Sequence, residues 1–244
     1  MSKLYNEILN LKADEVSIIS ENRYVNLSSS SKALDKSFIR NILGFSNGQR
    51  VNLFSPELDS ILFKFEEPLI SSYSWYLMVR DPQMASDPVP FVIRYPSLSF
   101  QKRNHSNLSS QEREYIKKRW VEQYINVVHR ARSNRQKKDL IDSLEITLSE
   151  GTHLLYWSGN TLIGHGSYVE DYNPVLKLDN HYLHLWVEQS QNSDIRKNII
   201  QHFFNITSTL NSHSIGGIAV NNTKSIRMLL KSGFVPKMLS IEDY

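Results

Sequence analysis

Residues 183–234 read LHLWVEQSQNSDIRKNIIQHFFNITSTLNSHSIGGIAVNNTKSIRMLLKSGF, and they decide the fold of this 244-residue chain. The run Leu183–Val187 predicts a strand, and the apolar residues after Ser193 recur at helical spacing. The run Ser214–Val220 predicts a second strand, which leads into a second helix that begins at Asn222. The stretch therefore predicts the order strand, helix, strand, helix.

Both helices of this stretch carry local signals for their limits and their buried face. Asparagine is favoured at a helix N-cap because its side chain accepts a hydrogen bond from a free amide, as expected of Asn222. Glycine adopts the left-handed conformation that follows a last helical turn, as expected of Gly233. The first helix has an apolar face that predicts packing on a sheet, formed by Ile195, Ile199, Ile200, Phe203 and Phe204.

A long helix is predicted upstream, over residues 110–132. Residues 109–112 read SSQE, which has the form of a capping box, in which a serine hydroxyl and a glutamate carboxylate satisfy each other's backbone amides. Apolar side chains then recur every four residues, at Ile116, Trp120, Tyr124 and Val128. This spacing places them on one face of a helix.

The segment between this helix and Leu183 predicts a second helix and a β-hairpin. The helix covers residues 135–148, with Leu140, Ile141 and Leu144 on its inner side. The hairpin joins strands 153–157 and 161–169 through Ser158-Gly159-Asn160, a typical turn sequence. With a last strand at residues 235–241, the order from Ser110 is α, α, β, β, β, α, β, α, β.

This order resembles the CoA-binding half of the GNAT N-acyltransferase superfamily. The last conserved helix of that family is commonly written N-x-x-A-x-x-x-Y-x-x-x-G-F, and the corresponding residues here are Asn222, Ser225, Leu229, Gly233 and Phe234. The resemblance implies an α/β fold, with a mixed, mostly antiparallel sheet flanked by helices. It covers residues 109–244, which we interpret as a GNAT-like acyltransferase domain.

The division of the chain is predicted at the polar stretch Arg103–Leu108, which has no apolar period and reads as a surface connection. Residues 1–108 then form an N-terminal α+β region of unknown role. Tyr73–Val79 and Phe91–Tyr95 predict strands there because they are rich in aromatic and β-branched residues.

The resemblance also implies a cofactor and a place for it. Family members bind acyl-CoA, most simply acetyl-CoA, between two splayed strands, here the ones ending at Val187 and Val220. The residues that would hold it are Val187, Gln189, Ser193, Ile195, Arg196, Lys197 and Asn222. Free amides and the positive end of the helix dipole near Ser193 favour a phosphate, with help from Arg196 and Lys197 against the repulsion of Asp194.

The chain departs from the family pattern at two places. The family's phosphate-binding turn is written Q/R-x-x-G-x-G/A, whereas residues 191–196 read QNSDIR and contain no glycine. Leu229 stands where many members carry the tyrosine that protonates the leaving thiolate. Three hypotheses follow: an N-acyltransferase that uses acyl-CoA, a degenerate GNAT fold kept as a binding or regulatory module, and an enzyme with a non-CoA donor such as aminoacyl-tRNA.

The candidates for the general base lie on strand 182–188. Alternation places Leu183, Leu185 and Val187 on one face and His184, Trp186 and Glu188 on the other. In the family a carboxylate or histidine on this strand often takes the proton of the acceptor amine, which makes Glu188 and His184 the candidates. A solvated glutamate and a packed histidine are the alternative interpretation, because a base must first lie within reach of its proton.

Other chemistries lack a motif in the sequence. His181 and His184 are three residues apart, which on a strand places them on opposite faces, so no metal site is predicted. There is no G-x-S-x-G elbow and no P-loop. A basic cluster, Arg130, Arg132, Arg135, Lys137 and Lys138, fits either an anionic acceptor such as RNA or a solvated turn between helices.

Composition is that of an ordinary globular protein, with 40% hydrophobic and 22% charged residues. The absence of cysteine excludes disulfides, thiolate nucleophiles and Cys-ligated zinc. We expect a cytoplasmic protein without a membrane span, because no apolar run approaches that length and the first residues lack a signal-peptide pattern. The net charge of +3 is compatible with an acidic partner, and the amine acceptor could be a small molecule, a protein or RNA. The oligomeric state stays open.

Overall fold

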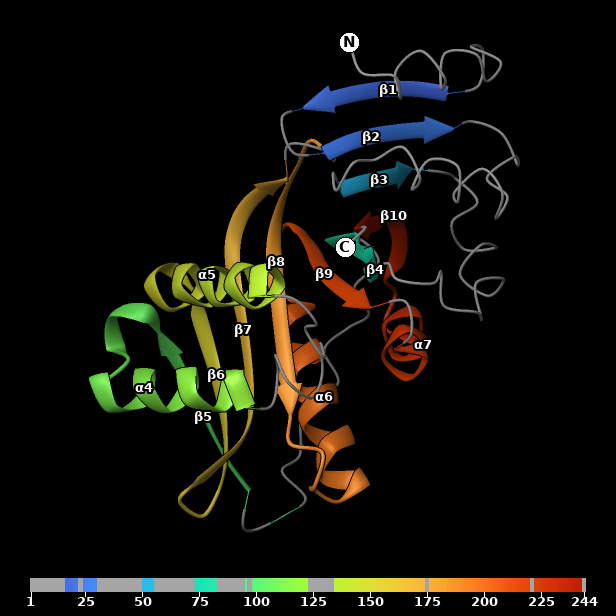
Figure 1. Ribbon diagram of the computed structural model, residues 1–244. Helices are drawn as coiled ribbons and strands as arrows, with labels where there is room; N and C mark the ends of the chain where they lie inside the picture. The colour runs from blue at the N-terminus through green and yellow to red at the C-terminus, as the bar shows by residue number, and fades with distance from the viewer. Residues whose placement is uncertain are drawn as a thin grey trace. The chain divides into compact units, whose positions relative to one another are not determined.

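The computed structural model describes residues 16–21, 24–29, 50–54, 73–82, 95, 98–122, 134–173, 176–219 and 222–242 (Figure 1). The chain forms two compact units, one from residues 1–79 together with 217–244 and the other from residues 80–216. The predicted boundary between residues 108 and 109 lies inside the second unit. That the chain can be divided there in solution stays a prediction.

The second unit is built on a mixed, mostly antiparallel sheet, as expected from the sequence. Its strands are β5 (Leu98–Asn104), β6 (Thr152–Ser158), β7 (Thr161–Asn173), β8 (Leu178–Val187) and the start of β9 (His213–Ala219). Neighbouring strands from β5 to β8 are antiparallel, whereas β8 and β9 are parallel. Residues 178–181 extend β8 beyond the predicted strand, and residues 170–173 extend β7.

Helices cover both faces of this sheet (Figure 1). On one face, α4 (Ser110–Arg119) and α5 (Asn134–Glu150) enclose a buried apolar cluster with the strands. The members of that cluster are Leu108, Ile116, Trp120, Leu144, Leu148, Leu155, Leu162 and Trp186. On the other face, α6 (Ser193–Thr207) lies close to β7, where Ile199 and Phe203 approach the backbone of Gly164 and Gly166.

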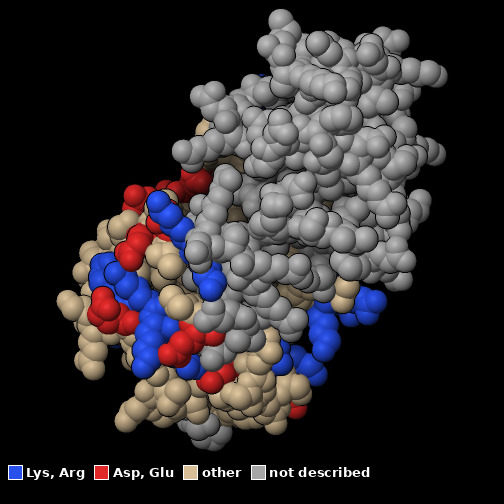
Figure 2. Space-filling model, in the orientation of Figure 1, with Lys and Arg blue, Asp and Glu red and all other residues tan. Residues whose placement is uncertain are grey.

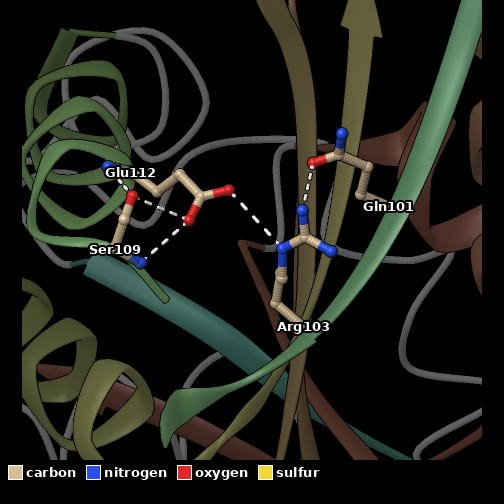
Figure 3. Close-up of polar contacts among 4 residues, drawn as sticks. All are labelled: Gln101, Arg103, Ser109 and Glu112. Carbon is tan, nitrogen blue, oxygen red and sulfur yellow. Dashed lines mark hydrogen bonds and ion pairs between the residues drawn. The ribbon is translucent and has the colours of Figure 1, made fainter. Parts of the chain in front are cut away.

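The predicted capping box begins α4 (Figure 3). The Ser109 hydroxyl accepts a hydrogen bond from the Glu112 amide at 3.1 Å, and the Glu112 carboxylate accepts from the Ser109 amide at 2.9 Å. The α-helix ends at Arg119 and continues as a π-helical turn over residues 120–122. Residues 123–132 of the predicted helix lie outside the described residues.

The stretch predicted as a surface connection, residues 103–108, is exposed at residues 104–107, but it begins inside a strand and ends on a buried residue. Arg103 and Asn104 belong to β5 and pair with His153 and Thr152. Arg103 also forms an ion pair with Glu112 at 3.6 Å (Figure 3), and Leu108 is buried in the apolar cluster. The sequence did not predict this part of the strand, because its side chains are polar and lie at the partly exposed end of β5.

The second predicted helix is confirmed as α5, with one of its inner residues corrected. Leu144 is buried and Leu140 packs against the apolar cluster, as predicted. Ile141 is 37% exposed, so its assignment to the inner side is wrong. Leu140, Leu144 and Leu148 recur every four residues and share the face that packs against the apolar cluster, whereas Ile141 lies to one side of that row.

The hairpin of β6 and β7 is confirmed, including its turn, in which Gly159 has φ of 57°. The register between the two strands shifts after Tyr156, which pairs with Gly164, whereas Trp157 pairs with Leu162. Ile163 is therefore an extra residue in β7, as in a β-bulge. The shift turns Leu162 toward α4 and α5 although Gly164 faces α6.

The other unit contains β1 (Val16–Glu21), β2 (Tyr24–Ser29), β3 (Arg50–Phe54), β4 (Tyr73–Arg80, whose last residue begins the second unit), β10 (Val235–Glu242) and helix α7 (Thr223–Lys231). Strand β10 pairs antiparallel with both β3 and β4, while β2 and β3 are parallel. The prediction of a strand at Tyr73–Val79 is confirmed by β4. Most of the strand predicted at Phe91–Tyr95 lies outside the described residues.

The predicted limits of α7 are confirmed by its caps. The Asn222 side chain accepts a hydrogen bond from the Ser225 amide at 3.3 Å. Gly233 has φ of 80°, and the Phe234 amide donates to the Leu229 carbonyl. Such a glycine ends a helix at little cost, since a side chain would strain the left-handed backbone.

Candidate functional site

Strand β8 continues past the point where its pairing with β9 stops. Within the described residues the parallel register covers Asn180–Tyr182, opposite His213–Ile215. On the other edge of β8, pairing with β7 continues to Val187, and the Glu188 amide donates to the Ile163 carbonyl at 2.8 Å. The two strands therefore share only the first half of β8.

This register determines the direction in which the backbone groups of the second half of β8 point. In an antiparallel pair, successive residues direct their N–H and C=O groups to alternate edges of the strand. Since Glu188 bonds to β7, Val187 directs its amide and carbonyl to the opposite edge, as do Leu185 and Leu183. That is the edge along which β9 pairs with residues 180–182.

Glu188 follows directly at the end of β8 and is held by an arginine from α4. Arg119 Nη2 lies 3.0 Å from Glu188 Oε2, and both side chains are largely buried, with 14% and 19% exposed. Arg119 also contacts Glu122 at 3.2 Å and lies over the Trp186 ring. Burial alone would lower the pKa of Arg119, but the two carboxylates outweigh it and raise that pKa.

His184 lies three residues before the end of β8, on the face covered by α5. It is 5% exposed. Its Nε2 is 3.4 Å from the Ser143 hydroxyl, and the Trp120 ring meets it edge to face at 5.4 Å. Of the two predicted bases, Glu188 is thus the more accessible.

The N-terminus of α6 begins at Ser193, as predicted, with Asn192 as its cap. The Asn192 side chain accepts from the Asp194 amide at 2.8 Å, so this first-turn donor already has a partner. Asp194 and Lys197 are exposed and form an ion pair at 3.5 Å. Arg196 and Ile195 are partly buried in the same turn.

The predicted site residues fall into both units. Val187, Gln189, Glu188 and the α6 N-terminus belong to residues 80–216, and Gln189 is exposed. Asn222 belongs to the other unit, where it caps α7. Sequence reasoning missed Arg119, because its partner Glu188 lies far along the chain and no local pattern connects a helix end to a strand end.

The basic cluster is only partly described. Arg130 and Arg132 lie outside the described residues, whereas Lys137 and Lys138 are exposed on α5. On the described part of the face in Figure 2, basic and acidic side chains are interspersed. An ion pair joins α4 to α5, with Lys117 Nζ 3.0 Å from Glu145 Oε1.

No group of three or more His, Cys, Asp or Glu residues in the described part of the chain has the geometry of a metal site. No helix there has the length and apolar character needed to span a bilayer.

The chain is similar in structure to several solved proteins. No protein-family model and no curated protein matches the sequence. An acetyltransferase from the GNAT family of Colwellia psychrerythraea is similar with a TM-score of 0.48 and 11% identity, over 94% of this chain and 81% of that one. A GCN5-related N-acetyltransferase from Kribbella flavida has a TM-score of 0.42 and 9% identity, over 100% and 96%.

A conserved protein of unknown function from Staphylococcus epidermidis is similar to a like degree, with a TM-score of 0.47 and 12% identity over 95% and 94% of the two chains. The order of elements from α4 to β10 is the α, α, β, β, β, α, β, α, β expected of the family, and it follows a first strand, β5. In this order of elements the fold is GNAT-like.

Proposed function

We propose that this protein is an N-acyltransferase that transfers an acyl group, most simply acetyl, from acyl-CoA to a primary amine. The observation that carries the proposal is the early end of the β8–β9 register at Tyr182 and Ile215. Beyond it, Leu183, Leu185 and Val187 direct backbone donors and acceptors to an edge without a paired strand among the described residues. A pantetheine chain carries amides that can bond to such an edge.

In this proposal the Val187 amide also polarises the carbonyl of the thioester, as an oxyanion donor does. The amine nitrogen attacks the thioester carbon, the C–S bond breaks, and CoA leaves as the thiol. Glu188 accepts the proton of the amine, directly or through water, and the departing CoA sulfur takes up that proton in the same way. His184 is the second candidate for the role of base. The acceptor would be a small molecule, a protein or RNA.

Arg119 would hold the Glu188 carboxylate in place at the end of β8. Its guanidinium occupies one carboxylate oxygen, Oε2, at 3.0 Å. A base held in this way loses little freedom when substrate binds, which favours a productive geometry. Arg196 and Lys197 in the first turn of α6 would offset the charge of Asp194 and attract the CoA phosphates.

A second candidate function is a GNAT fold kept as a binding module, or one that takes its acyl group from a non-CoA donor such as aminoacyl-tRNA. The observation that favours it is the chemistry of the first turn of α6. Asn192 already accepts from the Asp194 amide, and the Asp194 carboxylate repels a phosphate. The turn also lacks the glycines that would let a pyrophosphate approach the backbone closely.

Binding and chemistry can be tested separately. Calorimetry with acetyl-CoA should show binding to the parent, a loss of at least about tenfold in affinity for Arg196→Glu/Lys197→Glu, and tighter binding for Asp194→Gly. The matched control is Lys137→Glu/Lys138→Glu, which makes the same charge change at exposed positions of α5. It should bind like the parent.

Turnover of acetyl-CoA with a panel of amines then tests the base. Glu188→Gln should lower kcat by about 100-fold or more while acetyl-CoA binding persists, since a general base contributes on the order of 10²–10⁴-fold. Glu145→Gln, which removes an exposed carboxylate from α5, should leave kcat unchanged. No heat with acetyl-CoA at millimolar concentration would reject the CoA-dependent enzyme and favour the second candidate.

A further inference from the structure

Three residues with the chemistry of a nucleophilic centre meet at the opposite end of β8. The Ser212 hydroxyl lies 2.5 Å from His181 Nδ1. On the other side of the ring, His181 Nε2 lies 3.6 Å from Glu170 Oε1. The His181 imidazole therefore has a serine hydroxyl at one ring nitrogen and a carboxylate at the other.

The sheet itself brings the three together. Glu170 on β7 and His181 on β8 are directly opposite each other in the antiparallel register, so their side chains share a face. Ser212 immediately precedes β9, which pairs in parallel with this part of β8 through His181 and Ser214. All belong to residues 80–216.

The geometry fits one tautomer of His181 well. With its proton on Nε2, the ring directs that N–H at Glu170 and leaves Nδ1 as an acceptor for the Ser212 hydroxyl. A nucleophile bonded to a base that is in turn oriented by a third group is the arrangement that activates serine. Glu170 is 90% exposed, so it orients the ring more weakly than a buried carboxylate would.

The surroundings of the ring favour its neutral form. His181 is 8% exposed and meets the Tyr168 ring edge to face at 5.7 Å. Burial lowers the pKa of His181, and the charge of Glu170 opposes that effect without cancelling it. A neutral imidazole can accept the serine proton. Ser212 itself is only partly buried.

We propose that Ser212 is an activated nucleophile, with His181 as its base and Glu170 as the group that positions His181, and that this centre hydrolyses small activated esters. The Ser212 oxygen attacks the ester carbonyl and its proton moves to His181 Nδ1. The C–O bond to the leaving group breaks, and the leaving alkoxide takes that proton. Water then attacks the acyl-serine, which releases the acid and restores the hydroxyl.

This centre is independent of the proposed acyl-CoA site. His181 lies on β8 and Glu188 follows the end of that strand seven residues later, a separation of roughly 23 Å at 3.3 Å per residue of extended chain. None of the three residues belongs to the predicted CoA site. A failure of acetyl-CoA binding therefore says nothing about Ser212, and the reverse also holds.

The test is the rate at which a fluorophosphonate probe labels each serine, followed by peptide mapping in the mass spectrometer. The probe forms a Ser–O–P bond and releases fluoride. Ser212 in the native protein should react at least about 100-fold faster than Ser149, an exposed serine whose hydroxyl donates to the Ile146 carbonyl. The preference should disappear in denaturing urea, because it depends on the folded arrangement.

Variants then assign the roles. His181→Gln should slow labelling of Ser212 by about 100-fold, and Glu170→Gln by no more than about fivefold, as expected for an exposed partner. Hydrolysis of p-nitrophenyl acetate should fall in the same order and should be absent in Ser212→Ala but retained in Ser149→Ala. Equal labelling rates for Ser212 and Ser149 in the native parent would overturn the proposal, and this comparison needs no variant to fold.

Discussion

The two faces of the sheet formed by β6, β7 and β8 are packed in opposite ways. Toward α6, β7 presents Gly164 and Gly166, and the rings and branches of Phe203 and Ile199 fill the space that side chains would occupy. The fit is close enough that a Cβ at Gly166 would lie 2.3 Å from the Phe203 ring. This face depends on shape.

The face under α5 contains a layer of polar side chains. His153 and His165 are stacked and fully buried, with Nδ1 of the first 3.0 Å from Nε2 of the second. Ser167 lies opposite both His153 and His184 in the strand register and is also fully buried. A hydrogen bond between two imidazoles needs one ring nitrogen that accepts, so at least one of the two rings must be neutral. The packing of this face therefore depends on protonation as well as on shape.

Lowering the pH should have the largest effect on stability, because it acts on the buried histidines. Burial lowers the pKa of His153 to about 4 and that of His165 well below 6.5. Burial also lowers the pKa of His202, on α6, to about 4. Between pH 6.5 and 4 the unfolded chain thus binds more protons than the native one, so stability is fully present above pH 6.5 and falls as the pH is lowered. Urea unfolding should show a loss on the order of 2 kcal/mol per buried histidine between pH 7 and 5.

A double variant separates the polar face from other acid effects. His153→Leu/His165→Leu should weaken the dependence of stability on pH, since it removes two of the groups that must take up protons. Identical urea midpoints for the parent at pH 7 and 5 would contradict the account of the polar layer.

A methyl group on the other face tests the dependence on shape. Gly166→Ala should lower the free energy of unfolding by about 1–3 kcal/mol, because the fully buried Phe203 must shift to admit it. Gly216→Ala on β9 is the matched control, since a Cβ there meets no atom within 4 Å. It should be neutral or slightly stabilising. Equal effects of the two changes would show that α6 is not held by close packing at Gly166.

The smallest effect is expected at the start of α4, where a local motif can be removed without touching either face. Ser109→Ala should cost about 1 kcal/mol, because the Glu112 amide loses its acceptor. Ser109→Asp should retain most of the stability, since aspartate also caps helices. Thermal unfolding of the three proteins makes the comparison, and a Ser109→Ala variant as stable as the parent would mean that the capping box contributes nothing.

The candidate site illustrates how far sequence reasoning reaches. Alternation along β8 correctly separated the face of His184 from that of His181, since the first contacts Ser143 and the second contacts Ser212. The start of α6 at Ser193 was also predictable, because its apolar spacing is local. The ion pair of Arg119 with Glu188 was not, because no sequence period relates a residue of α4 to one at the end of β8.

The sequence by itself determined the elements from α4 to β10 and their order, because caps, turns and apolar periods act over a few residues. Tertiary structure alone decided which distant residues meet: Arg119 with Glu188, His153 with His165, and Ser212 with His181 and Glu170. It also corrected Ile141 and the stretch at Arg103, where local polarity and spacing were misleading. The physical reason is that strand register and the side of the sheet taken by each helix are set by the packing of the whole unit, and a single residue shift in register exchanges the two faces.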